Sequence, residues 1–124
     1  MNKVPRRGEI WNLCFDPTVG SEMKKTRPAV ILSSDAMGKL PVKLVAPLTE
    51  WDEKFSRNVW HVPLAPDAAN GLKKISAVDV LQSRCVSWQR FVEKLGVVPE
   101  ETMRKIVAAL LIIVEYEEKK DDDL

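Results

Sequence analysis

Hydrophobic residues in the first hundred positions come in short runs that proline, glycine and polar residues interrupt. Short runs rich in Val, Ile, Leu and aromatic residues favour β-strands over helices. A polar, lysine-rich loop at residues 16–28 separates the first two runs. We expect strands at residues 9–15, 29–33, 42–48, 58–64, 76–82 and 84–87, with 91–95 either a last short strand or a helical turn.

Three of these segments carry a more specific pattern. Residues 29–33 (AVILS) form a continuous apolar run, which predicts a central strand that is buried on both faces. Pro47 cannot donate a backbone hydrogen bond, so we expect its strand to lie at an edge of the sheet or to end there. Residues 58–64 (NVWHVPL) alternate between two faces, as a half-buried strand does.

The pattern changes near Pro99, where apolar residues begin to recur at helical spacing. Pro99 followed by Glu100 and Glu101 is typical of a helix start, because the missing N–H costs nothing there and the acids face the positive end of the helix dipole. Residues 106–114 (IVAALLIIV) are apolar without interruption. We therefore expect the helix to be covered by the sheet on one side and by a second copy of the chain on another.

Together these elements predict a mainly β (α+β) protein, with a small, barrel-like antiparallel sheet followed by one C-terminal α-helix. A chain of 124 residues fits one domain and leaves no room for separate catalytic and binding domains. We expect this domain to span residues 1–118 and the charged residues 119–124 to form a tail.

The net charge of +1 hides an uneven distribution of charge along the chain. Residues 1–114 contain 17 Lys and Arg against 12 Asp and Glu, whereas residues 115–124 contain six acids and two lysines. A basic body with an acidic tail suits a polyanionic ligand, although charge alone does not identify one.

Location and redox state follow from other features of the sequence. No apolar run is long enough to cross a membrane, and the first residues lack the apolar stretch of a signal peptide, so we expect a cytoplasmic protein. Cys14 and Cys85 are far apart and have no metal-ligand spacing. We expect both cysteines to be reduced and mostly buried.

Most of the familiar catalytic motifs are missing from the sequence, including the P-loop, GxSxG and GxGxxG. His61 is the only histidine, which excludes a two-histidine ribonuclease and an HExxH zinc site. The acids do not cluster as a two-metal nuclease requires. We therefore expect no metal and no cofactor, and we interpret His61 as a structural residue.

The remaining candidate for chemistry is the loop exit GSEMKKTRP, which places Lys24, Lys25 and Arg27 at the mouth of a buried strand. Pro28 restricts Arg27 to an extended conformation, so the guanidinium projects from a rigid element. A guanidinium fixed in this way can hold two phosphate oxygens at once. The alternative interpretation is a solvated charged loop, and composition does not decide between the two.

Residues 6–35 resemble the N-terminal signature of MazF/PemK-type toxins, with the RGE-aromatic opening, DPTVGSE, KTRP and an apolar strand ending in Ser-x-Asp. Further along, VAPLT at residues 45–49 resembles the family's strand that ends in threonine. The closing GVVPEETMRKIVAALLIIV resembles its terminal helix. The family pattern S-V-x(4–5)-Q-x-R falls on Ser76, Gln82 and Arg84. The resemblance covers essentially the whole chain.

The resemblance implies a compact SH3-like barrel that works as a homodimer and cleaves single-stranded RNA at a short sequence. It also implies a cognate antitoxin whose disordered tail blocks the RNA groove. The family's catalytic arginine falls on Arg27 and its catalytic threonine on Thr49. The expected RNA-binding residues around them are Lys24, Lys25, Thr26, Trp51, Ser76, Gln82 and Arg84, with core or dimer packing as an equally good interpretation of Trp51. The loop is expected to be held in place by Gly20, Ser21 and Glu22.

RNA carries its own nucleophile, the 2′-hydroxyl, so a site of this kind needs alignment and charge stabilisation. Arg27 beside the scissile phosphate would stabilise the transition state, and Thr49 would fix the in-line geometry. Two alternatives stay open: a toxin of the same fold that binds a protein target such as gyrase, and a non-catalytic SH3-like module that binds nucleic acid. Residues 50–58 and 66–74 depart from the family pattern, so the recognised RNA sequence is undetermined, as are the antitoxin and the general acid and base.

Overall fold

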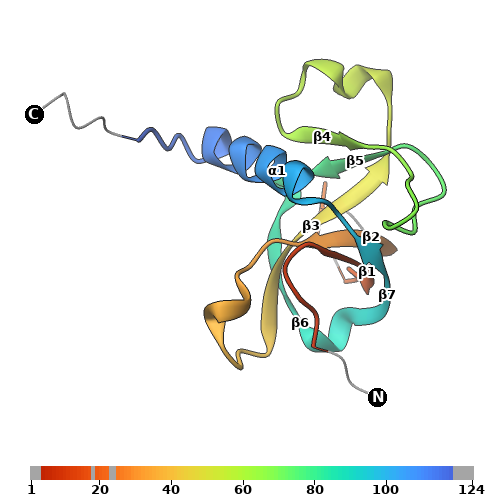
Figure 1. Ribbon diagram of the computed structural model, residues 1–124, viewed down its shortest axis with the longest axis vertical. Coiled ribbons are helices and arrows are strands. Elements are labelled where there is room, and N and C mark those ends of the chain that lie inside the picture. Colours follow the sequence, from red (N-terminus) through yellow and green to blue (C-terminus); the bar gives the residue numbers. More distant parts are fainter. Residues whose placement is uncertain (1–3, 18, 23–24, 119–124) are drawn as a thin grey trace, which may run out of the picture.

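The computed structural model describes residues 4–17, 19–22 and 25–118, which form a curved antiparallel sheet with one helix against it (Figure 1). The strands are β1 (Glu9–Cys14), β2 (Thr26–Ile31), β3 (Val42–Glu50), β4 (His61–Leu64), β5 (Ser76–Asp79), β6 (Arg84–Ser87) and β7 (Phe91–Val97), and the helix is α1 (Glu100–Ile113). Short 3₁₀ helices occupy Asp35–Met37, Glu53–Arg57, Val80–Gln82 and Trp88–Arg90. The tail expected at residues 119–124 lies outside the described residues.

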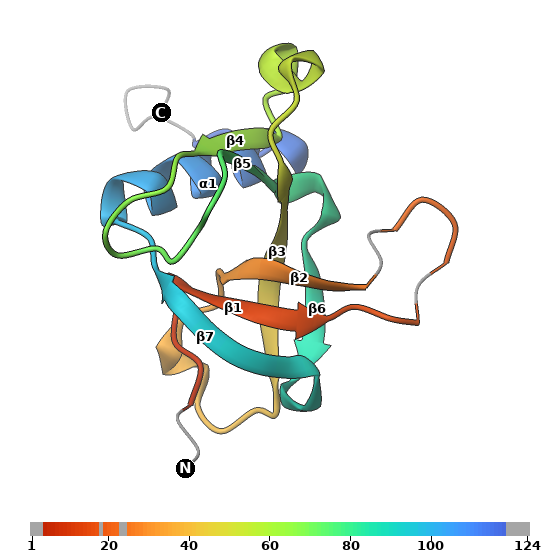
Figure 2. The same cartoon turned by 90° about the vertical axis from the view of Figure 1, so that its right-hand side faces the viewer.

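The longest strand, β3, organises the sheet. It pairs with β2 along one edge, and along the other edge it pairs first with β6 and then with β5. The strand order is β4-β5-β3-β2-β1-β7, and every pair is antiparallel. The strands curl round a common core (Figure 2), but within the described residues β4 and β7 do not pair with each other. The predicted antiparallel β fold with a C-terminal helix is confirmed, as a barrel that is not fully closed.

Pro47 does not mark an edge strand or a strand end, so that prediction was wrong. The strand continues to Glu50 in the interior of the sheet. On the edge shared by β6 and β5, residues 42–45 pair with β6 and residues 48–50 pair with β5. Pro47 falls between these two stretches. No strand pairs with residue 47 along this edge, so the missing proline N–H breaks no ladder hydrogen bond there.

The core lies on both faces of β2. Ala29, Val30 and Ile31 are completely buried, which confirms the prediction of a central strand buried on both sides. Val30 packs in a cluster beneath α1, whereas Ala29 and Ile31 pack in a second cluster on the opposite face with Trp11 and Phe15. The period of two along the strand therefore divides its residues between two apolar layers.

The helix begins directly after Pro99, with Glu100 and Glu101 in its first turn, as predicted. Its residues Met103, Ile106 and Ala109 are buried against the sheet. Other apolar residues in the second half of α1 and just after it remain exposed within the single chain; they are Val107, Leu111, Ile112 and Val114, 37% to 61% exposed.

Most of the predicted strands differ from the structure at their ends. β2, for example, runs from Thr26 to Ile31, whereas a loop was expected up to residue 28 and a strand at residues 29–33. The strand expected at residues 58–64 begins only at His61, because a 3₁₀ helix precedes it and the His61 amide donates to the Asn58 carbonyl (3.1 Å). The strand expected at 76–82 ends at Asp79, where the chain enters another 3₁₀ turn. Residues 91–97 form a strand, which decides between the two alternatives for that segment.

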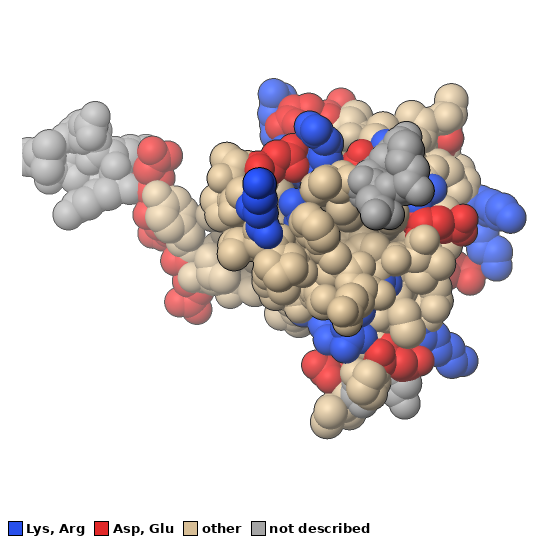
Figure 3. Space-filling model, turned by 90° about the horizontal axis from the view of Figure 1, so that it is seen from below, with Lys and Arg blue, Asp and Glu red and all other residues tan. Residues whose placement is uncertain are grey.

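The surface of the described residues carries both positive and negative side chains. On the face shown in Figure 3, charged side chains of both signs surround a largely uncharged centre, so no single sign dominates that face.

Both cysteines are free, but Cys85 is exposed and Cys14 half-buried, so the expectation of buried cysteines was wrong for Cys85. No helix within the described ranges is long and apolar enough to cross a membrane.

Candidate active site

The candidate site opens where β2 and β3 separate. Their ladder ends at Ala29 opposite Pro47; beyond this pair β2 stays beside β1, while β3 turns to pair with β5 (Figure 1). Arg27 and Thr49 lie two residues beyond the last pair, one on each strand. A continued antiparallel register would place these two residues opposite each other. The separation of the strands instead leaves a cleft between them.

Arg27 and Thr49 both line this cleft, which has a volume of about 590 Å³. Its other walls come from β1, from the end of β3, from the loop before β5 and from β7. The two residues singled out in the sequence are therefore brought to one cavity by the register of β2 and β3.

The turn that leads into β2 is held by the backbone. Lys25 has φ 68°, in the left-handed region that a non-glycine residue rarely adopts. Its carbonyl accepts a hydrogen bond from the Phe15 amide (2.9 Å), which closes the loop at the end of β1. Arg27 then pairs with Leu13 in the ladder between β1 and β2, so the arginine projects from a fixed strand. Lys24 lies outside the described residues.

Positive charge predominates along the cleft. Four cations line it, against the two carboxylates Glu50 and Glu93; the cations are Lys25, Arg27, Lys73 and Lys74. The Lys74 ammonium lies 3.7 Å from a Glu50 carboxylate oxygen, and Glu93 accepts a hydrogen bond from the Asn12 amide (3.3 Å). A concave surface with an excess of cations raises the local concentration of a polyanion.

The structure divides the expected RNA-binding residues between different places. Lys25, Thr26 and Ser76 line the cleft together with Arg27 and Thr49. Ser76 is buried, and its hydroxyl donates to the Lys74 carbonyl (3.1 Å).

Trp51 lines neither this cleft nor the pocket that contains Gln82. Its indole N–H donates to Glu53 (3.1 Å), and its ring meets Phe55 edge-on at 5.9 Å. In this arrangement the ring packs against the 3₁₀ helix that follows β3.

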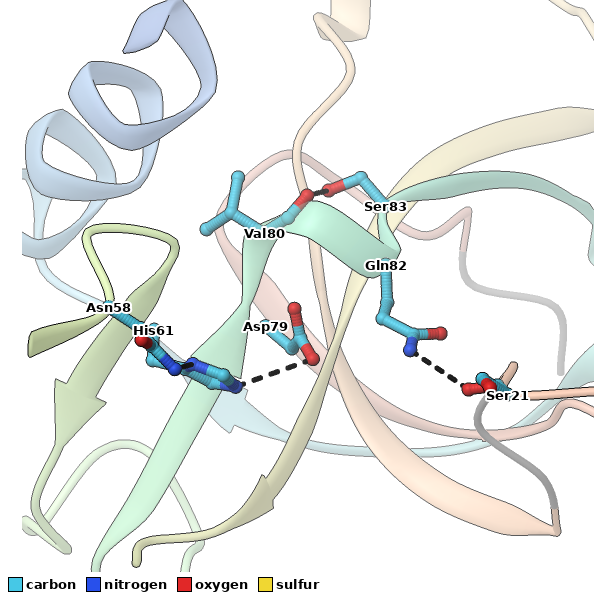
Figure 4. Close-up of polar contacts among 7 residues, drawn as sticks. All are labelled: Ser21, Asn58, His61, Asp79, Val80, Gln82 and Ser83. Carbon is cyan, nitrogen blue, oxygen red and sulfur yellow. Dashed lines mark hydrogen bonds and ion pairs between the residues drawn. The ribbon is translucent and has the colours of Figure 1, made fainter. Parts of the chain in front are cut away.

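Gln82 and Arg84 line a second pocket, of about 220 Å³, together with Phe15 and Glu22. The Gln82 side chain donates to the Ser21 carbonyl (3.1 Å; Figure 4), and the Arg84 guanidinium lies 5.7 Å from the centre of the Phe15 ring. Both residues therefore lie beside the loop that precedes β2 and not in the cleft of Arg27.

Glu22 is bonded within its own loop. Its carboxylate accepts a hydrogen bond from the Val19 amide (2.6 Å), across a turn in which Gly20 has a positive φ of 59°. Together with the Gln82 bond to Ser21, this contact is of the kind expected for a residue that holds the loop in place.

His61 is enclosed by other side chains and lies outside both pockets. Its Nε2 lies 3.5 Å from Asp79 Oδ2, its Nδ1 is 3.2 Å from the Asn58 amide nitrogen, and its ring stacks on Phe55 at 3.9 Å (Figure 4). The side chains of His61 and Asp79 are both less than a tenth exposed. These contacts tie β4 to β5 and fit a structural histidine.

Glu9, in the RGE opening of the sequence, joins three segments. It binds the Arg6 amide (2.8 Å), the Trp11 indole N–H (3.0 Å) and the Lys94 ammonium (2.9 Å). Burial by itself raises the pKa of Glu9, but these hydrogen bonds and the charge of Lys94 outweigh it and leave the pKa lowered. Glu9 therefore acts as an ionised bridge between β1 and β7.

Sequence reasoning left Lys73 and Lys74 out of the site, because residues 66–74 were treated as a variable loop. The available signal was the dipeptide Asn70-Gly71, which is typical of a defined turn. In the described part of the chain, no three His, Cys, Asp or Glu side chains gather as metal ligands would.

Comparison with known proteins shows the family of the chain. A family model for PemK-like, MazF-like toxins of type II toxin-antitoxin systems matches residues 6–114. The chain is 29% identical over 109 residues to a protein of Bacillus subtilis named endoribonuclease EndoA, covering 86% of this chain and 91% of that protein.

Solved structures show the same fold. A crystal structure of MazF from Deinococcus radiodurans has a TM-score of 0.78 and 24% identity, and the match covers 93% of this chain and 100% of the other. A mycobacterial endoribonuclease in complex with its cognate antitoxin has a TM-score of 0.73 and 18% identity, with 94% and 100% covered. At these identities the structural likeness supports the fold.

Proposed function

The chain belongs to the family of PemK-like, MazF-like toxins of type II toxin-antitoxin systems, and we propose that it is a metal-independent endoribonuclease that cleaves single-stranded RNA at a short sequence. The observation that carries this proposal is the placement of Arg27 and Thr49 in one basic cleft, on two strands that separate around it. The relative from Bacillus subtilis, which is named an endoribonuclease, supports the same activity.

In the proposed reaction the 2′-hydroxyl of the RNA attacks the adjacent phosphorus, and the 5′-oxygen of the next nucleotide leaves. Arg27 binds the phosphate and stabilises the extra negative charge of the transition state. Thr49, from the facing strand, hydrogen-bonds a phosphate oxygen or the attacking hydroxyl and holds the in-line geometry.

Digestion of a defined RNA strand tests this proposal. We expect cleavage in excess EDTA, a 2′,3′-cyclic phosphate or its opened 3′-phosphate, and a 5′-hydroxyl on the downstream fragment. A strand with deoxyribose just 5′ of the mapped cut should bind almost as well, because phosphates carry most of the affinity, but it should stay intact. Cleavage of that strand at the same bond would mean that water is the nucleophile, and the mechanism would be abandoned.

The same digestion separates the proposal from its alternatives. A toxin directed at a protein target would leave RNA intact and unbound, whereas a non-catalytic SH3-like module would bind RNA without producing new ends. The basic cleft favours a polyanion over a protein target, because four cations face two carboxylates along it.

The proposed working form is a homodimer in the cytoplasm. Its support is an exposed apolar stripe along the second half of α1, in which Val107, Leu111 and Val114 follow one another at helical spacing. An apolar stripe that the sheet does not bury is expected to be buried in an interface. A second copy of the chain would bury it.

The proposed protein partner is an antitoxin that competes with RNA. The excess of cations in the cleft suits an acidic, partly disordered segment with apolar anchors. Such a segment should slow cleavage, and its binding should weaken as salt is added. Binding of the cognate antitoxin without inhibition would place its site elsewhere on the surface.

A further inference from the structure

The loop that joins β4 to β5, residues 65–75, has a path that its own hydrogen bonds fix. Asn70 is completely buried at its centre. The Asn70 side chain accepts hydrogen bonds from the Asp67 amide (3.2 Å) and the Leu72 amide (3.0 Å), and it donates to the Ala65 carbonyl (2.9 Å). A buried amide that is satisfied on both its oxygen and its nitrogen fixes the path of the backbone around it.

Backbone contacts hold the β4–β5 loop against β7 on one side. The Val97 amide donates to the Ala69 carbonyl (3.0 Å), and the loop passes beside the end of β7 (Figure 2). A Cβ at Gly96 would lie well under 3.0 Å from Ala69 and Asn70 backbone atoms, and a Cβ at Gly71 would lie equally close to the Leu95 backbone. Only glycine allows this approach at these two positions.

The other end of the β4–β5 loop is fastened to β3. The Trp51 amide donates to the Ile75 carbonyl (2.9 Å), and Glu50 pairs with Ser76 at the start of β5. The loop is therefore fixed to β7 at its middle and to β3 at its end. It forms a rigid wall of the cleft, on which Gly71, Leu72, Lys73 and Lys74 are lining residues.

This wall carries two lysines that can accept a new partner. The ion pair between Lys74 and Glu50 is 3.7 Å long with side chains 72% and 68% exposed, so it is a weak pair that a phosphate can replace. Lys73 is exposed as well, and it makes no ion pair with any residue in the described ranges.

We propose that Lys73 and Lys74 are positioning residues that bind backbone phosphates of the RNA beside the scissile bond, on the wall of the cleft that the β4–β5 loop provides. This inference rests on the proposed endoribonuclease function. With Arg27 and Thr49 at the scissile phosphate, the strand lies between the end of β2 and this loop, and the lysines hold the neighbouring nucleotides. Phosphate contacts fix the register of a strand without reading its sequence. The lysines therefore determine how tightly the strand is held and leave the chemical step to Arg27 and Thr49.

The test measures RNA binding and cleavage for Lys73→Ala, Lys74→Ala and the double variant. Binding uses the strand with deoxyribose at the mapped cut, over a series of salt concentrations. Each lost phosphate contact should reduce the slope of log K against log salt by about 0.7, which corresponds to about fourfold weaker binding at 0.15 M salt and more than about tenfold for the pair. KM should rise by the same factors, while kcat stays within about threefold of the wild type.

Two matched variants complete the experiment. Lys73→Arg with Lys74→Arg keeps both charges and should keep the wild-type slope. Lys39→Ala removes an exposed lysine between β2 and β3 that does not line the cleft, and it should change neither slope nor KM.

The outcomes are distinct. A wild type that binds and cuts RNA, with alanine variants of unchanged slope and KM, would overturn this inference and leave the proposed function standing. A fall in kcat at unchanged KM would also overturn it, because the lysines would then act on the transition state. A wild type that neither binds nor cuts RNA would overturn the proposed function and this inference together.

Discussion

At the scale of single residues, the site depends on two side chains that come from different strands. Arg27 follows a turn closed by the Lys25 carbonyl and projects from β2, and Thr49 follows the point at which β3 changes partner. Neither residue has a histidine or a metal-ligand cluster nearby in the described cleft. In the proposed reaction Arg27 supplies charge stabilisation and Thr49 supplies alignment.

Substitution of these two residues tests their roles. Arg27→Ala should lower kcat/KM by at least about a hundredfold, the effect of removing one transition-state donor, while Thr49→Ala should have a smaller effect. The measurement is cleavage of a labelled strand, with circular dichroism to confirm that each variant folds. If Arg27→Ala cleaves the strand at the wild-type rate, the site has been assigned to the wrong residue.

Glu9 gives a prediction about stability and pH. Its lowered pKa means that the ionised form is stabilised by folding, so this contribution is fully present above about pH 4.5 and is lost as the pH falls through the lower folded-state pKa. Glu9→Gln should reduce the free energy of unfolding at pH 7 by about 1–2 kcal/mol, since a hydrogen-bonded charge is removed. Urea denaturation should show the difference from wild type shrinking as the pH is lowered to 3.

The control for Glu9 is Glu117→Gln, which removes an exposed carboxylate beyond the end of α1. This change should alter stability by less than about 0.5 kcal/mol at either pH. A Glu9→Gln effect that is equally large at pH 3 and pH 7 would contradict the charge argument.

At the scale of elements, the cleft is made by one strand that changes partner and one loop that is fixed. β3 pairs with β6 and β2 before Pro47 and with β5 after it, which separates it from β2. The β4–β5 loop closes the opening on the far side and rests on β7 through Gly96. The shape of the cleft therefore depends on backbone contacts as much as on its lining side chains.

Gly96→Ala tests the contact between the β4–β5 loop and β7. The new methyl group would meet backbone atoms of Ala69 and Asn70, which no rotamer change can move, so unfolding should become easier by about 1–3 kcal/mol. Urea denaturation measures the loss. The matched control Val97→Ala, at the next and partly exposed position, should cost less than half as much. Equal effects at the two positions would argue against a close approach at Gly96.

At the scale of the whole molecule, the exposed side of α1 is the feature that a single chain leaves incomplete. Val107, Leu111, Ile112 and Val114 are all more than a third exposed, although Met103, Ile106 and Ala109 of the same helix are buried against the sheet. A group of exposed apolar residues of this kind is typical of an interaction surface. The proposed homodimer would cover it.

Sedimentation tests the homodimer. At micromolar concentration we expect one species near twice the chain mass of 14.0 kDa. Leu111→Glu should shift the protein towards the monomer, because it places a charge in the apolar stripe. Lys39→Glu adds the same acid away from the helix and should leave the mass unchanged. A wild-type monomer under these conditions would refute the dimer.

The order of residues along the chain was enough to predict the kinds of elements and to identify the family. Alternation and short apolar runs predicted the strands, and a change to helical spacing predicted α1, because these patterns follow from which side chains face the core. KTRP and VAPLT, with their neighbours, also identified the candidate residues Arg27 and Thr49, since a motif lies within a few consecutive positions.

Which of these residues meet in one site follows from the fold and not from the order of residues. Gln82 and Arg84 face a different pocket from Arg27, and Lys73 and Lys74 join the cleft, because strand pairing and loop docking bring together positions that are far apart in the chain. The ends of β3, β4 and β5 were decided in the same way, by the 3₁₀ turns and by the partners of β3. Local patterns carry no information about such contacts, which depend on register between distant segments.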